Sequence, residues 1–235
     1  MTSAILVAAG KGTRMGLNVD KLFLELHGCP VVGHAWRRFD SAPCIDEIVL
    51  VVRPGTEAVF SELGRRLGLR KPCHFAEGGK ERQDSVWNGL TAVSEDTLLV
   101  AIHDAARPCT SEGTISAALE AASRTGAAVA AQPITDTVKE SEDGRLALRT
   151  LDRSRLWTVQ TPQCFRLAVI RHALAEVRRR GLIVTDDTAA CELVGHPVQL
   201  VPSTDPNPKV TRPEDLALIE LILSRLSAPP PVPSP

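Results

Sequence analysis

The sequence predicts an α/β fold in which helices flank a mostly parallel sheet. Short apolar runs alternate with amphipathic stretches of helix length, which is the order of successive β-α-β units. The runs at residues 4–9 and 45–52 are almost continuously apolar, as expected of strands that are buried on both faces. Residues 134–158 differ, because apolar and polar positions alternate there around Glu142-Asp143-Gly144. That pattern favours a projecting β-hairpin, with an irregular surface loop as the alternative.

The expected elements follow one another in a regular order. Strands are expected over residues 4–9, 45–52, 73–77, 97–105 and 127–133. Helices are expected over residues 31–39, 56–68, 82–93, 111–126, 166–181 and 212–226. Gly181 ends one of these helices and Pro213 opens another, in line with the residue preferences of helix ends. We therefore expect one domain over residues 1–227, with 134–158 as an arm, and a disordered Pro-rich tail over 228–235.

The composition excludes several classes of protein. Hydrophobic residues make up 43% of the 235 residues, and no apolar stretch approaches the roughly 20 residues of a membrane span. The formal net charge of -1 gives no reason to expect a nucleic acid or a membrane as partner. The N-terminal segment has no export-signal pattern, and the six cysteines form no C-x-x-C pair. We therefore expect a cytoplasmic protein with reduced thiols.

A glycine-rich segment, AAGKGTRMG at residues 8–16, follows the first expected strand. Its glycines would let the backbone approach a phosphate group, and its two cations would add charge. These residues are Gly10, Gly12, Gly16, Lys11 and Arg14. The glycine spacing fits neither the dinucleotide-binding fingerprint, because the third glycine is one residue late, nor the P-loop, because leucine follows it. A plain strand-to-helix turn with solvated cations is the alternative.

The longer pattern is more specific. The loop followed by Lys21 in DKLFLEL resembles the signature of sugar-nucleotide nucleotidyltransferases. Six further blocks resemble one family among them, the 2-C-methyl-D-erythritol 4-phosphate cytidylyltransferases of non-mevalonate isoprenoid synthesis. The blocks are GGKERQDSV (78–86), HDAARP (103–108), PITDTVK (133–139), WTVQTPQCF (157–165), VTDDTAA (184–190) and NPKVTRPEDL (207–216). The resemblance spans about residues 4–225 and implies a Rossmann-like twisted sheet, a single nucleotidyltransferase domain and a homodimer formed through the arm.

The resemblance also implies roles for individual residues. Catalytic roles fall on Arg14, Lys21 and Lys209. Nucleotide contacts fall on Ala8, Ala9, Gly10, Gly12, Gly79, Lys80, Arg82 and Ser85. Contacts with the sugar phosphate fall on Asp104, Arg107, Thr137, Arg153, Thr161 and Thr185, of which the arm residues would reach the neighbouring subunit's site. The implied cofactor is Mg²⁺, held either by Asp104 or through the phosphates of CTP alone.

Local chemistry agrees with several of these roles. Asp104 ends an apolar strand, where open α/β sheets bind ligands. His103 beside it is interpreted as structural, because phosphoryl transfer supplies its own nucleophile and leaving group. Asp20 stands immediately before Lys21 where members of the family more often carry proline, which leaves the path of that loop open.

The implied reaction joins CTP and 2-C-methyl-D-erythritol 4-phosphate to give pyrophosphate and 4-diphosphocytidyl-2-C-methyl-D-erythritol. A ribitol 5-phosphate cytidylyltransferase is the first alternative, because it would share the nucleotide half of the site. A non-catalytic nucleotide-sensing module is the second, although the joint presence of Arg14, Lys21, Asp104 and Lys209 argues against it. A nicotinamide-dependent oxidoreductase is disfavoured by the glycine spacing.

Overall fold

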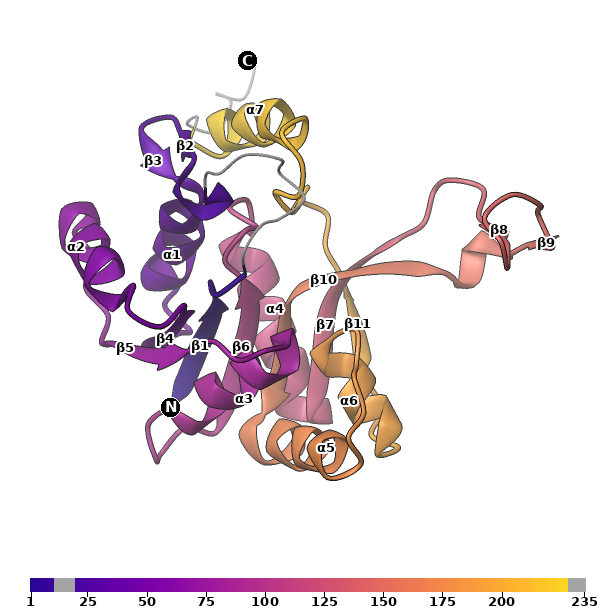
Figure 1. The fold of residues 1–235 in the computed structure, drawn as a ribbon, viewed down its shortest axis with the longest axis horizontal. Helices are drawn as coiled ribbons and strands as arrows, with labels where there is room; N and C mark the ends of the chain where they lie inside the picture. Colours follow the sequence, from indigo (N-terminus) through magenta and orange to yellow (C-terminus); the bar gives the residue numbers. More distant parts are fainter. Residues whose placement is uncertain (11–19, 228–235) are drawn as a thin grey trace, which may run out of the picture.

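The computed structural model describes residues 1–10 and 20–227. Its centre is a seven-stranded sheet in the order β11-β7-β10-β6-β1-β4-β5 (Figure 1). The strands are β1 (Thr2–Val7), β4 (Glu47–Val52), β5 (Cys73–Glu77), β6 (Leu99–Asp104), β7 (Ala127–Pro133), β10 (Trp157–Arg166) and β11 (Gln199–Pro202). All pairings are parallel except those of β10, which lies antiparallel between β6 and β7. The predicted mostly parallel sheet is confirmed.

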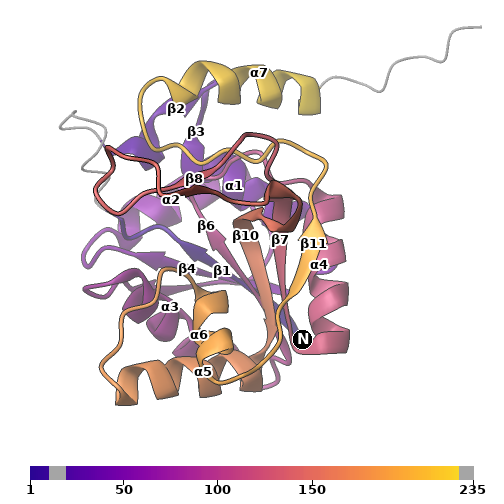
Figure 2. The same cartoon turned by 90° about the vertical axis from the view of Figure 1, so that its right-hand side faces the viewer.

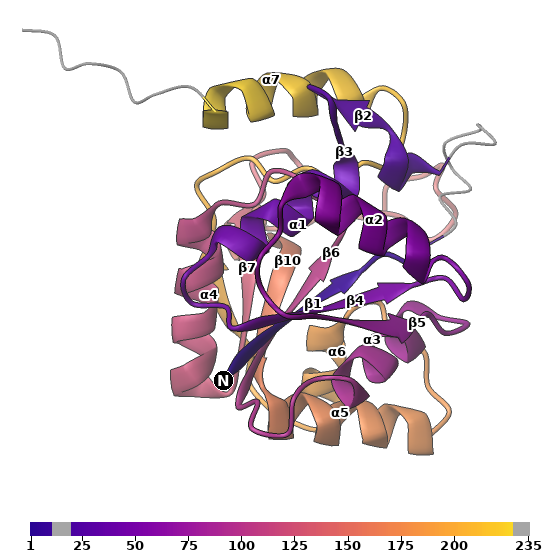
Figure 3. The same ribbon diagram turned by 90° about the vertical axis from the view of Figure 1, so that its left-hand side faces the viewer.

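Helices cover both faces of this sheet. They are α1 (Val31–Ser41), α2 (Glu57–Leu67), α3 (Arg82–Thr91), α4 (Glu112–Thr125), α5 (Leu167–Arg179), α6 (Asp187–Leu193) and α7 (Asp215–Ser227). Helices α3, α5 and α6 lie on one face, and α1, α2 and α4 on the other (Figure 3). The helices predicted from the sequence are present, and α6, β10 and β11 are additional elements that no periodicity indicated.

Side-chain alternation within the central strands explains why both faces are covered. In β1, Ala4 and Leu6 join the core under α1, while Ile5 between them joins the core under α3 and α5. In β4, Leu50 joins the first of these cores and Val51 joins the second. All five side chains are fully buried, which explains why the strands are almost continuously apolar in the sequence.

The C-terminal part of the chain returns to the ends of the central strands. The backbone N–H of Val210 donates to the carbonyl oxygen of Ala106, 2.8 Å away, in the loop after β6. Helix α7 then packs through Ile219 and Leu223 against the core beneath it. Two two-residue strands, β2 (Glu25–Leu26) and β3 (Cys29–Pro30), pair as a small hairpin near α7. This return brings Lys209 to the loop after β6.

The predicted arm projects away from the sheet between β7 and β10 (Figure 1) and points toward the viewer in Figure 2. It contains a two-residue ladder between β8 (Lys139–Glu140) and β9 (Arg149–Thr150), and the 3-10 turn η3 (Arg153–Arg155). The predicted turn at Glu142-Asp143-Gly144 is present, with Gly144 at a φ of 70°. The ladder is much shorter than the sequence alternation, because the arm has no second layer in this chain on which to bury a face.

Three further expectations concern membrane-spanning helices, the cysteines and the C-terminal tail. No helix among residues 1–10 and 20–227 is long and apolar enough to cross a membrane. All six cysteines lie in the described segments and are unpaired. The Pro-rich tail at 228–235 lies outside the described residues.

Candidate active site

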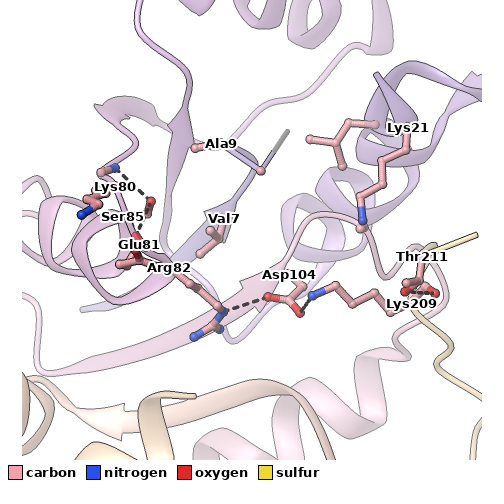
Figure 4. A pocket seen from close by; sticks show the side chains of 14 residues that line it. Val7, Ala9, Lys21, Lys80, Glu81, Arg82, Ser85, Asp104, Lys209 and Thr211 are labelled. Carbon is pink, nitrogen blue, oxygen red and sulfur yellow. Dashed lines mark hydrogen bonds and ion pairs between the residues drawn. The ribbon is translucent and has the colours of Figure 1, made fainter. Parts of the chain in front are cut away.

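A cavity of about 470 Å³ opens at the carboxyl ends of β1 and β6. The chain passes from β1 to β4 on one side and returns to β6 on the other, so the cavity lies at the switch point of strand order. Its lining comes from five segments of the chain, which are the ends of β1 and β6, the turn at Lys21, the start of α3 and the loop before α7. Figure 4 shows Lys80 and Ser85 on one side of it and Lys21 and Lys209 on the other.

Lys21 begins the short 3-10 helix η2 (Lys21–Phe23). The carboxylate of Asp20 caps this turn by accepting from the backbone N–H of Leu22, 3.1 Å away, and pairs with the guanidinium of Arg53. The ammonium of Lys21 donates to the carbonyl oxygen of Val210 at 2.7 Å. Asp20 therefore fixes the turn that carries Lys21, while the loop before it, whose path the absence of proline left open, lies outside the described residues.

The wall formed by the start of α3 requires glycine. A Cβ atom on Gly78 would lie 2.2 Å from the Cβ of Ala9, and one on Gly79 would lie 2.3 Å from the Cβ of Asp84. The N–H of Gly79 donates to the hydroxyl of Ser85 at 3.0 Å. This close packing places the backbone after β5 directly beside the backbone after β1, where a flat base could lie against both.

Asp104 is the centre of a cluster of cations at the end of β6. Lys209 Nζ lies 2.7 Å from one carboxylate oxygen and Arg82 Nε lies 3.2 Å from the other (Figure 4). Arg107 Nε lies 3.9 Å from the oxygen that Lys209 contacts. Burial raises the pKa of Asp104, but Arg82 and Lys209 outweigh burial and hold it well below its ordinary value. The carboxylate is therefore ionised at neutral pH and orients the cations around it.

Arg82 has a second carboxylate partner. Its Nη1 lies 2.8 Å from Asp187 Oδ2, on a side chain that is fully buried at the start of α6. Burial opposes the charge on Arg82, but Asp187 and Asp104 together raise its pKa. Sequence reasoning missed Asp187, although it lies in the VTDDTAA block two residues after Thr185.

The residues of the site that could hold a metal ion are few. No group of three or more His, Cys, Asp or Glu side chains among residues 1–10 and 20–227 could form a metal site. Asp104 is a single carboxylate already paired with two cations. A Mg²⁺ ion at this cavity would therefore take most of its ligands from phosphate oxygens and water, which is a common arrangement for this ion.

Comparison with known proteins places this geometry in a family. Residues 2–225 match the family model described as 2-C-methyl-D-erythritol 4-phosphate cytidylyltransferase. A curated relative of that name from Pelotomaculum thermopropionicum is 45% identical over 94% of this chain and 93% of its own length. A chloroplastic relative from Oryza sativa is 39% identical over 94% of this chain and 74% of its own length. The chain belongs to this family. The family resemblance stated from the motifs is confirmed.

Solved structures agree with the cytidylyltransferase fold. The crystal structure of 4-diphosphocytidyl-2C-methyl-D-erythritol synthase from Anaerococcus prevotii has a TM-score of 0.84 and 28% identity, covering 95% of this chain and 98% of that one. The cytidylyltransferase structure from Thermus thermophilus has a TM-score of 0.75 and 34% identity, covering 96% of this chain and 100% of that one. The expected Rossmann-like fold and the expectation of a nucleotidyltransferase enzyme are thus confirmed.

The cavity of this cytidylyltransferase brings together most of the residues that the resemblance selected. Those lining it are Ala9, Gly10, Lys21, Gly79, Lys80, Arg82, Ser85, Asp104 and Lys209. Glu81 and Thr211 also line it and were not predicted. Gly12 and Arg14 lie outside the described residues.

Other predicted residues lie away from the cavity lining. Ala8 is buried and donates its N–H to the carbonyl oxygen of Val51 at 2.7 Å. Thr185 is exposed in the turn before α6. The arm residues Thr137 and Arg153 are exposed as well, and Arg153 donates to the carbonyl oxygen of its own Thr135. Within this single chain the arm does not complete the cavity.

Thr161 and Arg107 are partly occupied by contacts within the protein. The Thr161 hydroxyl accepts the backbone N–H of Asp104 at 3.1 Å, and its side chain is buried. Arg107 Nη1 donates to the carbonyl oxygen of Asn207 at 2.7 Å. Asn207 is a further residue that the sequence analysis passed over, although it opens the block that contains Lys209.

His103, which the sequence analysis interprets as structural, has a fully buried ring that does not line the cavity. The ring packs on Phe39 with centroids 4.7 Å apart. Burial lowers the pKa of His103 from 6.5 to about 4. The folded protein therefore holds a neutral imidazole at pH values where the unfolded chain is already protonated.

We expect the free energy of unfolding to fall by about 2 kcal/mol between pH 6.5 and pH 5 through His103 alone. The unfolded chain binds more protons than the folded protein between the two pKa values, so acid stabilises the unfolded state. The stabilisation is complete above pH 6.5 and is lost as the pH falls toward 4. Urea denaturation of the wild type and His103→Phe at several pH values measures the difference, and parallel curves for the two proteins contradict the assignment.

Proposed function

We propose that this chain transfers a cytidylyl group from CTP to 2-C-methyl-D-erythritol 4-phosphate, releasing pyrophosphate and 4-diphosphocytidyl-2-C-methyl-D-erythritol. The observation that carries the proposal is the cavity at the switch point, lined by glycine backbone on one side and by cations on the other, in a chain of this family. Such a cavity has room for a base and ribose against the backbone and for phosphates against the cations.

The chemistry needs no catalytic base from the protein. The second pKa of a phosphate monoester is near 6, so the attacking phosphate oxygen is largely ionised at neutral pH. The barrier is instead the approach of one anion to the α-phosphorus of another. Lys21 and Lys209 lie on the side of the cavity opposite Lys80 and Ser85. There they would offset charge on the triphosphate and on the acceptor phosphate.

Asp104 has a positioning role in this scheme. It holds Lys209 at 2.7 Å and Arg82 at 3.2 Å, so both cations keep a defined place before any substrate enters. Preorganised charges of this kind cost little reorganisation when the transition state forms. We also infer that Arg14, which lies outside the described residues, acts on the triphosphate as the sequence resemblance implies.

Mg²⁺ is the proposed cofactor. Bound between triphosphate oxygens, it would neutralise charge and favour departure of pyrophosphate. Among the described residues Asp104 is the candidate protein ligand, but its two cationic partners leave the phosphates of CTP as the main ligands.

The arm supports a proposal about assembly. Leu146 and Leu148 on it are 77% and 61% exposed, and a short hairpin gains stability when a second surface covers it. We infer a homodimer in which Thr137 and Arg153 enter the partner's acceptor site. A cytoplasmic location is also proposed, because the six unpaired cysteines suit a reducing compartment.

The test is product analysis with Mg²⁺ and all pairings of CTP or UTP with 2-C-methyl-D-erythritol 4-phosphate or ribitol 5-phosphate. We expect product from CTP and the methylerythritol acceptor, with CTP preferred over UTP by at least about tenfold, since exchanging an amino donor for a carbonyl acceptor mismatches buried polar groups. Preference for ribitol 5-phosphate would reassign the acceptor. Equal use of CTP and UTP would show that the site does not select cytosine, and absence of any product would favour a sensing module.

A further inference from the structure

Beneath the cation cluster, four residues form a closed ring of hydrogen bonds, called the buried ring below. His103 Nε2 donates to the carbonyl oxygen of Arg107 at 3.0 Å, and Arg107 Nη1 donates to the carbonyl oxygen of Asn207 at 2.7 Å. Asn207 Nδ2 donates to the carbonyl oxygen of Thr161 at 2.8 Å. The Thr161 hydroxyl and His103 Nδ1, 3.0 Å apart, close the ring.

The direction of each bond follows from the chemistry of the groups. A carbonyl oxygen only accepts, so His103 Nε2 must carry the proton. Nδ1 of the neutral ring is then an acceptor, and the Thr161 hydroxyl donates its single proton to it. The same hydroxyl accepts the backbone N–H of Asp104 at 3.1 Å. Every hydrogen-bonding atom of the His103 ring is therefore used, and none faces the cavity.

The buried ring joins three segments that are distant in the sequence. His103 precedes Asp104 at the end of β6, Arg107 lies in the loop that follows, and Thr161 lies in the bulged middle of β10. Asn207 lies two residues before Lys209. The ring thus fixes the relative positions of the acidic and basic members of the cluster. Among the described residues, no hydrogen bond joins a member of the buried ring to Gly79 or Ser85.

We propose that His103 is a positioning residue for the acceptor half of the reaction, acting through Thr161 and Asn207 on Asp104, Arg107 and Lys209. The inference rests on the proposed function, because it assigns the acceptor phosphate to these cations. It predicts that damage to the ring impairs use of the acceptor and spares use of CTP.

Variants at His103 separate the two bonds of the imidazole. His103→Phe removes both and keeps an aromatic ring against Phe39. His103→Gln keeps an amide donor that can reach the Arg107 carbonyl, and loses the acceptor for Thr161. Thr161→Val removes the hydroxyl while keeping its shape, and Thr161→Ser retains it. Thr97→Val is the matched control, because Thr97 is a buried threonine whose hydroxyl bonds Ser3 and Glu47 at the opposite end of the sheet.

We expect His103→Phe and Thr161→Val each to lower kcat/KM for the acceptor about tenfold, while KM for CTP changes by less than about twofold. His103→Gln should lie between the wild type and His103→Phe, and Thr161→Ser should restore activity. The double variant His103→Phe/Thr161→Val should lose less activity than the product of the two single losses, since both single changes break the bond between Thr161 and His103. Thr97→Val should lose stability without moving the acceptor KM.

The remaining outcomes would contradict the proposed role of His103. If Thr161 contacts the acceptor directly, the activity losses of the two single variants multiply in the double variant. His103 then does not act through the buried ring. If acceptor and CTP parameters change equally, His103 is a general stabiliser and the proposal is wrong. Should His103→Phe fail to fold, the comparison of Thr161→Val with Thr161→Ser and Thr97→Val still decides. If the wild-type protein itself forms no product, the proposed function is wrong, and this inference falls with it. If the wild type is active and the variants of the buried ring keep its kinetic parameters, this inference alone is wrong.

Discussion

Lys21→Ala is expected to lower kcat by about 10²-fold or more, the scale for loss of one strong electrostatic contact in a transition state. Lys21 is only 9% exposed, its turn is capped by Asp20, and its ammonium is held 2.7 Å from the carbonyl oxygen of Val210. A cation fixed in this way at the cavity can stabilise developing negative charge without moving. Pyrophosphate release under saturating substrates measures kcat, and circular dichroism with a thermal melt checks the fold.

Lys71→Ala is a suitable control, because Lys71 lies in the turn before β5 and does not line the cavity. It should leave kcat within about twofold of the wild type, as expected of a surface change away from the site. Arg14→Ala is expected to resemble Lys21→Ala on the basis of the sequence alone. Turnover near the wild-type rate in Lys21→Ala would remove this lysine from the mechanism.

A mixed dimer of Lys21→Ala and Arg153→Ala chains is expected to regain about half of the wild-type activity, although each parent homodimer is weak. If Arg153 enters the partner's site, one site of the mixed dimer combines an intact Lys21 with an Arg153 supplied by the Lys21→Ala chain. That site is wild type, and its companion carries both defects. Differently tagged chains, co-expressed and purified as the heterodimer, give the measurement.

A second mixed dimer provides the matched control. Lys21 and Lys209 line one cavity of the same chain, so a dimer of Lys21→Ala and Lys209→Ala chains has a defect in both sites and should stay as weak as its parents. Recovery in that control would point to chain exchange or to incomplete purification. If the Arg153 heterodimer is no more active than its parents, Arg153 works within its own chain or not at all.

The sequence by itself determined the layers of the fold. Strands β1 and β4 are apolar at almost every position, which predicted burial on both faces and hence helices on both sides. It did not predict β10 as an antiparallel strand between β6 and β7. That strand contains polar residues and a bulge between Val159 and Gln163, so neither the alternating nor the continuous apolar pattern describes it. Its place is decided by pairing with β6 and β7.

The sequence also selected the residue types of the site, since the motif blocks contain Lys21, Asp104 and Lys209. Only the tertiary structure decided what holds them. Lys209 and Asp104 are 105 residues apart, as are Arg82 and Asp187, and no local periodicity carries information over that distance. Whether a buried carboxylate or imidazole finds partners depends on which loops meet at the strand ends, and that is settled when the β-α-β units pack together.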